Sequence, residues 1–187
     1  MKNADALPKR KPLRLNGYDY SSCGAYFITL CVKDKRRIFW ESVGANCVRP
    51  DIVPLSRIGE IVSREIQKIS VIYDNVEVDK FVVMPNHVHM ILSILADDHG
   101  RTQFAPTVSR VVKQFKGSVT KQIGFSPWQR SYHDHVIRNV RDYEEIWQYI
   151  DENPFRWESD CYYKVKGQLN NGQVTSQTRY RGQLENE

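Results

Sequence analysis

The stretch Met84-Pro85-Asn86-His87-Val88-His89-Met90-Ile91-Leu92 places two histidines two positions apart, after a Pro-Asn turn and inside an apolar run. In an extended strand successive side chains alternate between faces, so His87 and His89 point the same way. The opposite face then carries Val88, Met90, Leu92 and Ile94. Two imidazoles on one strand face can hold one metal ion, although surface or core histidines also show this spacing. A metal site needs a third ligand from elsewhere in the chain.

The segments around this stretch predict an α+β fold in which helices flank an antiparallel sheet. Segments rich in β-branched and aromatic residues predict strands at 25–33, 76–84 and 87–95, with shorter extended pieces at 38–40, 48–53 and within 128–138. Apolar residues at helical spacing predict helices at 55–69, 107–122 and 142–152. The expected buried stripe of the last helix is Tyr143, Ile146, Trp147 and Ile150.

The length of 187 residues predicts one main domain. We place it at 17–160, between a basic arm at 1–16 and a polar tail at 161–187. No apolar run reaches the roughly 20 residues of a membrane span, so no membrane partner is expected. The basic start lacks the apolar centre of a secretory signal, and the four cysteines show no paired spacing. These features predict free thiols in a reducing cytoplasm.

Basic residues are segregated along the chain, whose net charge is +5. Segment 101–121 holds five basic residues and no acid, and 33–37 holds four basic residues and one acid. Segment 142–160, in contrast, has seven acids and one arginine. A segregated basic surface predicts a polyanionic partner such as nucleic acid, but the basic residues could equally solvate a helix face.

The predicted last helix offers partners for the histidines. Tyr149 and Asn153 are four residues apart, hence one turn apart on one face. Packing of Tyr149 in the core and capping by Asn153 would explain the pair without any chemistry. Alternatively, His87, His89 and Asn153 would hold a divalent ion that polarises a phosphate, and Tyr149 would attack the phosphorus. Mixed nitrogen and oxygen ligands favour Mg²⁺ or Mn²⁺ over a structural zinc site.

MPNHVHMIL at 84–92 resembles the histidine–hydrophobic–histidine (HUH) motif of single-tyrosine transposases. Four other segments resemble one branch, the REP-associated tyrosine transposases, which are relatives of small insertion-sequence transposases. They are GYDYSSCGAYFITLCV (17–32), FKGSVTK (115–121), WQRSYHDHVIRN (128–139) and DYEEIWQYIDENP (142–154). The motifs follow the family's order, and the resemblance spans roughly residues 16 to 160.

The resemblance implies a ferredoxin-like or RRM-like HUH endonuclease fold, with His87 and His89 as metal ligands and Tyr149 as the nucleophile. Asn153 stands where insertion-sequence relatives carry a glutamine ligand, and its side chain is one methylene shorter. The family cuts and rejoins single-stranded DNA near short hairpins through a 5′-phosphotyrosine intermediate. We therefore expect a metal-dependent single-strand endonuclease and strand transferase, cytoplasmic and associated with the nucleoid, acting as a monomer or homodimer.

Two other readings remain open. A catalytically silent hairpin-DNA-binding regulator would use the same fold, and a plasmid-type replication initiator or relaxase would share the chemistry in a larger chain. Tyr132, beside His133 and His135, competes for the role of nucleophile; the two histidines are interpreted as DNA contacts or loop hydrogen-bonders. Candidate DNA-binding residues, besides the arm at 9–14, are Arg36, Arg37, Lys113, Lys116, Trp128, Arg130, Tyr132 and Arg138.

Overall fold

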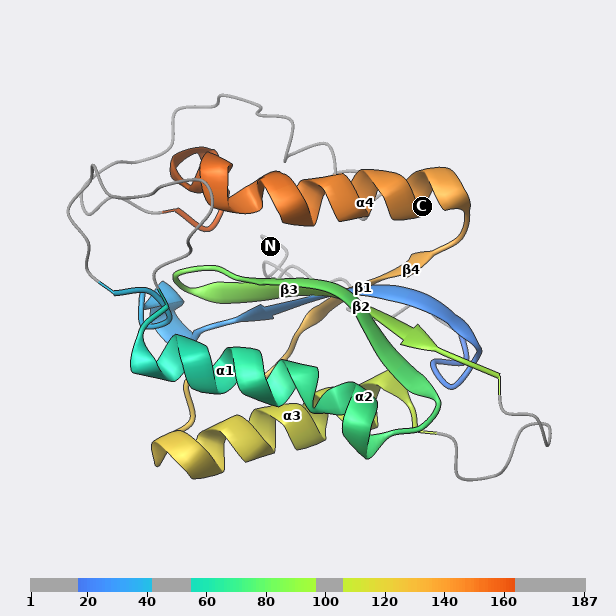
Figure 1. Ribbon diagram of the computed structural model, residues 1–187, viewed down its shortest axis with the longest axis horizontal. Helices are drawn as coiled ribbons and strands as arrows, with labels where there is room; N and C mark the ends of the chain where they lie inside the picture. The colour runs from blue at the N-terminus through green and yellow to red at the C-terminus, as the bar shows by residue number, and fades with distance from the viewer. Residues whose placement is uncertain (1–16, 42–54, 97–105, 164–187) are drawn as a thin grey trace, which may run out of the picture.

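A four-stranded antiparallel sheet forms the centre of the protein (Figure 1). The computed structural model describes residues 17–41, 55–96 and 106–163. The strands are β1 (Gly24–Cys31), β2 (Val76–Val83), β3 (His87–Ile94) and β4 (His133–Ile137), in the order β2-β3-β1-β4. The helices are α1 (Arg57–Gln67), α2 (Ile69–Ile72), α3 (Val108–Ile123) and α4 (Val140–Glu152), with 3-10 turns η1 (Lys33–Lys35) and η2 (Asn153–Ser159). The predicted α+β class and antiparallel sheet are confirmed.

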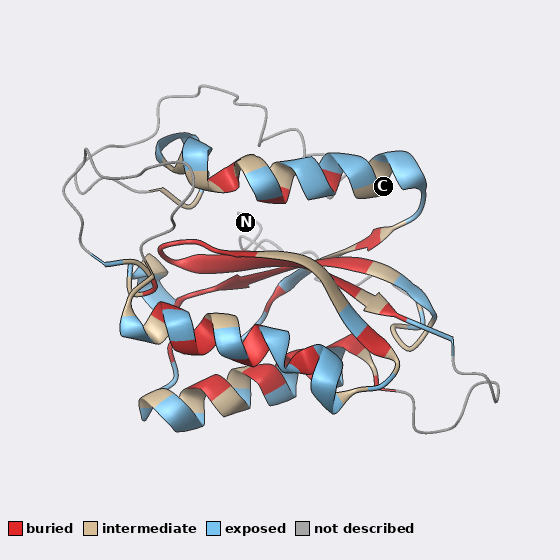
Figure 2. Ribbon diagram, in the orientation of Figure 1, coloured by how far each residue is buried: buried red, intermediate tan, exposed pale blue. Residues whose placement is uncertain are grey.

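Helices cover both faces of this sheet. Figure 1 shows α1 and α3 on one face and α4 on the other, and Figure 2 shows the buried positions concentrated in the sheet between them. The larger apolar cluster joins the sheet to α1 and α3. A smaller one, on the α4 face, joins Ile146 and Ile150 to Phe27, Met84 and Ile91. Because the second cluster is small, the α4 face has room for polar side chains.

The hairpin of β2 and β3 confirms the predicted alternation. Its turn at Pro85 and Asn86 is closed by the Met84 amide, which donates to the His87 carbonyl at 2.8 Å. Val88, Met90, Leu92 and Ile94 enter the larger cluster beneath α1 and α3. His87 and His89 therefore face α4, and both are buried.

The first predicted helix, 55–69, begins later than expected and continues as two helices. Leu55 forms a β-bridge with Trp40, and the Ser56 hydroxyl caps α1 by accepting from the Gly59 amide at 3.1 Å. Lys68 then separates α1 from α2. The segment 48–53, the arm at 1–16 and the tail from 164 onward lie outside the described residues.

The helix predicted at 107–122 and the strand predicted within 128–138 appear as α3 and β4. The Thr107 hydroxyl caps α3 by accepting from the Arg110 amide at 3.2 Å. At the other end, Gly124 adopts the left-handed conformation that ends many helices, with φ +82°. None of the described helices is long and apolar enough to cross a bilayer.

Trp147 corrects the expected stripe of α4. It is 37% exposed, whereas Ile146 and Ile150 are fully buried. Trp147 lies at the edge of the contact between α4 and the sheet. The Lys80 ammonium is 4.9 Å from the centroid of the Trp147 ring. Lys80 also pairs with Asp151 at 2.5 Å, and these contacts dock α4 on β2.

Candidate active site

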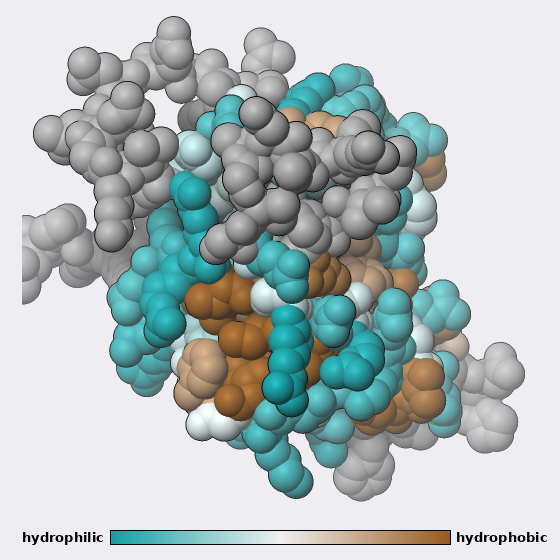
Figure 3. Space-filling view, turned by 60° about the vertical axis from the view of Figure 1, so that its left-hand side comes forward, coloured by the Kyte–Doolittle hydropathy of each residue, from teal (hydrophilic) through white to brown (hydrophobic). Residues whose placement is uncertain are grey.

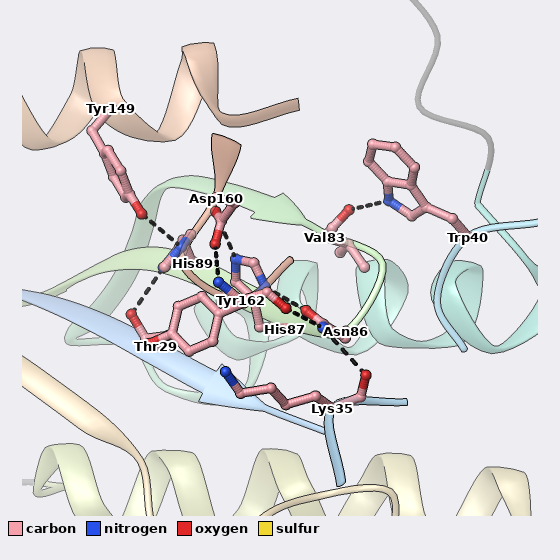
Figure 4. A network of polar contacts seen from close by, with 10 residues as sticks. All are labelled: Thr29, Lys35, Trp40, Val83, Asn86, His87, His89, Tyr149, Asp160 and Tyr162. Atoms are coloured by element: carbon pink, nitrogen blue, oxygen red, sulfur yellow. Dashed lines mark hydrogen bonds and ion pairs between the residues drawn. The ribbon is translucent and has the colours of Figure 1, made fainter. Parts of the chain in front are cut away.

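The two histidines of β3 meet α4 and the chain after η2 in a buried polar cluster (Figure 4). Tyr149 reaches this cluster from α4. Asp160, the residue directly after η2, adds its carboxylate to the cluster. The ligand atoms of His87, His89 and Asp160 all lie within 4.8 Å of one another. Asn153 is also buried, at the junction of α4 and η2.

His89 lies between a threonine and the tyrosine. Its Nδ1 is 2.8 Å from the hydroxyl of Thr29, which pairs with it across β1 and β3. Its Nε2 is 3.3 Å from the Tyr149 hydroxyl. Burial lowers the pKa of His89 to about 3, so the ring is neutral at physiological pH. A neutral imidazole can offer a lone pair to a metal.

Asn86 fixes the orientation of the His87 ring. The Asn86 amide nitrogen donates to the carbonyls of Lys35, at 3.3 Å, and Tyr162, at 3.0 Å. Its amide oxygen must therefore accept from His87 Nδ1, 2.9 Å away. His87 Nε2 is left without a proton, as in the histidine ligands of metal sites. Burial first, then His89 and Lys35, hold the pKa of His87 well below its usual value.

Four buried polar atoms of this cluster make no hydrogen bond of good geometry among the described residues. They are His87 Nε2, Asp160 Oδ2 and both amide atoms of Asn153. His87 Nε2 and Asp160 Oδ2 are 3.8 Å apart. Buried groups of this kind are normally satisfied, and an ion is one explanation when they are not. Imidazole nitrogens with a carboxylate oxygen suit a divalent transition ion such as Mn²⁺, so the residues present fit the metal that the sequence predicts.

Asp160 is a candidate ligand that the sequence reasoning did not single out. It belongs to the acidic segment 142–160 and has no helical spacing from Tyr149 or Asn153. The non-helical Arg156, with φ −102° and ψ 15°, redirects the chain within η2, and the Asp160 carboxylate then accepts from the Tyr162 amide at 2.6 Å. Burial raises the pKa of Asp160 despite nearby hydrogen bonds. The one signal in the sequence is that an aspartate can accept from the amide two residues later, which is typical of a turn.

The Tyr149 phenol is held in its protonated form. Burial raises its pKa well above the ordinary value, and the charge of Asp160 adds to the effect, while a contact with Asn153 opposes it. A phenol in this state is a poor nucleophile until a positive charge is brought near it.

Sequence comparisons place the chain among known proteins, although no protein-family model matches it. An uncharacterized Haemophilus influenzae protein is 33% identical over 173 residues, 82% of this chain and 93% of that protein. Another from H. influenzae, provisionally named a REP-associated tyrosine transposase, is 22% identical over 146 residues, 74% of each chain. The REP-associated tyrosine transposase of Escherichia coli K12 is 32% identical over 81 residues, 43% of this chain and 45% of that protein. These relatives confirm the resemblance of the chain to REP-associated tyrosine transposases.

A solved structure of a REP-associated tyrosine transposase bound to a REP hairpin has the same fold. The TM-score is 0.52, with 21% identity over 72% of this chain and 68% of that chain. The likeness supports the α+β architecture described above.

Aromatic and basic residues surround the cluster of His87, His89 and Asp160. The Tyr162 ring centroid is 4.5 Å from that of His87, and the Lys35 ammonium lies 5.2 Å from the Tyr162 centroid. Arg37 stacks over Tyr163, at 4.4 Å, and over Trp157, and both Arg37 and Arg36 are exposed. The sequence reasoning named both arginines but missed Lys35.

Other candidate DNA-binding residues lie away from this cluster. Lys113 and Lys116 are on α3, across the sheet, and the Lys116 ammonium donates to the carbonyls of Gln129 and Ser131 at 3.0 Å each. The expectation that Trp128 and Tyr132 stack on unpaired bases does not fit their burial, because they are only 6% and 8% exposed and pack in the larger cluster.

Two arginines and the second histidine pair remain at the surface or near it. Arg130 is exposed beside a cavity of about 480 Å³ lined also by Lys33, Asp34, Ser126, Trp128 and Gln129. Arg138 is exposed, and its backbone amide donates to Asp142 at 3.3 Å. His135 contacts the same carboxylate at 2.8 Å, which fits the expected role of a local hydrogen-bonder.

Proposed function

We propose that the protein is a metal-dependent enzyme that nicks and rejoins single-stranded DNA near hairpins through a 5′-phosphotyrosine intermediate. One observation carries the proposal: the Tyr149 hydroxyl lies 3.3 Å from His89 Nε2, next to the unpaired His87 Nε2 and Asp160 Oδ2. Similarity to REP-associated tyrosine transposases supports the reaction class, and the relative bound to a REP hairpin supports the substrate class.

His87, His89 and Asp160 would hold a divalent ion, Mn²⁺ or Mg²⁺, with the Asn153 amide beside them. The bound ion would supply Lewis-acid activation of the phosphate. Thr29 and Asn86 keep the two imidazoles in position from the side away from the ion. Tyr162, whose ring covers His87, limits the access of water to the site.

In the proposed step the Tyr149 oxygen bonds to phosphorus and the bond from phosphorus to the 3′ oxygen breaks. The phenol loses its proton, and the departing 3′ oxygen gains one. One phosphodiester replaces another, so the reaction is close to reversible. A second 3′ hydroxyl can then attack the phosphotyrosine and rejoin the strand without ATP. With single-stranded DNA as its substrate, the enzyme would act in the cytoplasm, at the nucleoid.

The test is to mix the protein, Mn²⁺ and a labelled single strand that carries a hairpin, then run a denaturing gel. We expect a covalent adduct with the wild type and with Tyr143→Phe, whose hydroxyl donates instead to Asp79 at 2.9 Å. Tyr149→Phe should give no adduct while still binding the strand. An adduct with Tyr149→Phe would remove Tyr149 from the role. Tight binding by the wild type with no adduct would favour the alternative, a catalytically silent hairpin-binding regulator.

A further inference from the structure

The turn η1 has an unusual backbone. Asp34 and Lys35 have φ values of 58° and 52°, and they are the only non-glycine residues with positive φ in the part of the chain that the structure describes. This left-handed conformation is unfavourable for residues other than glycine. Strained residues of this kind persist where the surrounding structure holds them, and they are frequent at functional sites.

Neighbouring segments hold this turn in place from both sides. The Lys33 amide donates to the Pro127 carbonyl at 2.7 Å, and the Lys35 amide donates to the Val32 carbonyl at 3.2 Å. Val32 is itself tied to the site, because its amide donates to the Asn86 carbonyl at 2.8 Å. The left-handed turn is therefore fixed relative to the hairpin that carries His87.

The strained turn brings Lys35 to the candidate metal ligands in two ways. Its carbonyl accepts from Asn86, the residue that orients His87. Its side chain runs beneath the Tyr162 ring, with the ammonium 5.2 Å from the ring centroid (Figure 4).

Among the described residues this ammonium forms no ion pair, and Lys35 is half-buried. Among the described residues the ammonium contacts the Tyr162 ring, so a phosphate bound beside that ring would supply its counter-ion. The Asp160 carboxylate is directed instead toward His87.

We propose that Lys35 binds a phosphate of the DNA strand, the one that lies against His87 and Asp160. The inference rests on the proposed function, because it needs a phosphodiester at this site. On the other side of η1, Lys33 and Arg130 line the 480 Å³ cavity. A strand that crosses the turn would keep its phosphates near basic side chains. Figure 3, in which the left-hand side of Figure 1 is turned forward, shows hydrophilic side chains that border an exposed hydrophobic surface.

The binding test uses a labelled hairpin-bearing single strand, with EDTA present to prevent cleavage, at several salt concentrations. Lys35→Gln should lower the affinity and reduce the slope of log K against log salt by about 0.7, the value for one contact with a single strand. Lys35→Arg should keep the slope. The control, Arg64→Gln, removes an equal charge from the exposed side of α1, and should leave the slope unchanged.

A second readout separates phosphate binding from damage to the site. Removing a cation beside the ligands should leave the affinity for Mn²⁺ unchanged or raise it, whereas a distorted site would bind both Mn²⁺ and DNA less well. An unchanged salt slope in Lys35→Gln, or a parallel loss of Mn²⁺ binding, would overturn the assignment of Lys35 alone. Failure of the wild type to bind any single strand would overturn the proposed function as well.

Discussion

The hydroxyl of Tyr149 and Nε2 of His89 are 3.3 Å apart, although the two residues come from different layers of the fold. The contact joins α4 to the central strand β3. In the tautomer in which His89 Nδ1–H donates to the Thr29 hydroxyl, His89 Nε2 carries no proton. Its lone pair then points toward the Tyr149 hydroxyl. The atom that would bind the metal is then the same atom that accepts from the nucleophile.

Tyr149→Phe should therefore bind Mn²⁺ more tightly than the wild type. The substitution removes a hydrogen bond that competes for the His89 lone pair, and one such bond contributes about 1 kcal/mol, or about fivefold in affinity. Isothermal titration with Mn²⁺ measures the difference, with Tyr143→Phe as the control. A tenfold or greater loss of affinity would instead make the Tyr149 oxygen a metal ligand.

Asp160→Asn should weaken Mn²⁺ binding by at least about tenfold, because the carboxylate charge is lost from the ligand set. Asn153→Ala should have a smaller effect, since its amide is neutral. With EDTA present, Asp160→Asn should unfold at the same or a higher temperature, because a buried carboxylate without an ion is costly. A larger loss of Mn²⁺ affinity in Asn153→Ala than in Asp160→Asn would identify Asn153 as the third ligand.

Gly59→Ala should destabilise the fold by about 3 kcal/mol, because a Cβ there would lie 2.1 Å from the Phe39 carbonyl oxygen, which is backbone. Gly117→Ala is the matched control, since a Cβ at this exposed position in α3 meets nothing within 4 Å. That change should stabilise the protein by up to about 1 kcal/mol. Urea unfolding measures both, and equal stabilities would show that α1 can move away from Phe39.

The sequence predicted the elements whose patterns are local. Alternation along 76–84 and 87–95, with a Pro-Asn turn between them, determines the hairpin within about one residue of β2 and β3. Spacing of four residues put Tyr149 and Asn153, the C-cap of α4, one turn apart on one side, and the structure brings Tyr149 to His89 and Asn153 to Tyr149 and Asp160. These relationships depend on backbone periodicity alone, which a sequence displays directly.

Asp160 and Lys35 were missed because non-periodic backbone places them. Asp160 reaches the histidines only through the bend at Arg156, and Lys35 only through two left-handed residues. Trp128 and Tyr132 show the converse, because their composition suggests exposed stacking platforms but tertiary packing buries them against Phe39, Phe115 and α3. Charge and aromatic content do not reveal on which side of a sheet a residue lies.

Acidification should destabilise the protein when no divalent ion is present, because His87 and His89 are buried as neutral rings. Burial depresses their folded pKa values, to about 3 for His89, whereas an unfolded histidine titrates near 6.5. As pH falls below about 6.5, the two histidines bind protons in the unfolded chain but stay neutral in the folded chain. The free energy of unfolding therefore decreases. One pH unit below the unfolded pKa, each ring contributes a loss of roughly 1.4 kcal/mol.

Urea unfolding in EDTA at pH values about one unit above and one unit below 6.5 measures this loss. In His89→Asn the free energy of unfolding should lose about half of its pH dependence, because His87 is then the one buried histidine among the described residues that stays neutral in the folded chain. The comparison with the variant matters because Asp160, whose pKa is raised, acts in the opposite direction and is common to both proteins. Equal pH dependence in the wild type and His89→Asn would mean that His89 becomes protonated in the folded state, so that Mn²⁺ would have to displace a proton to bind it at low pH.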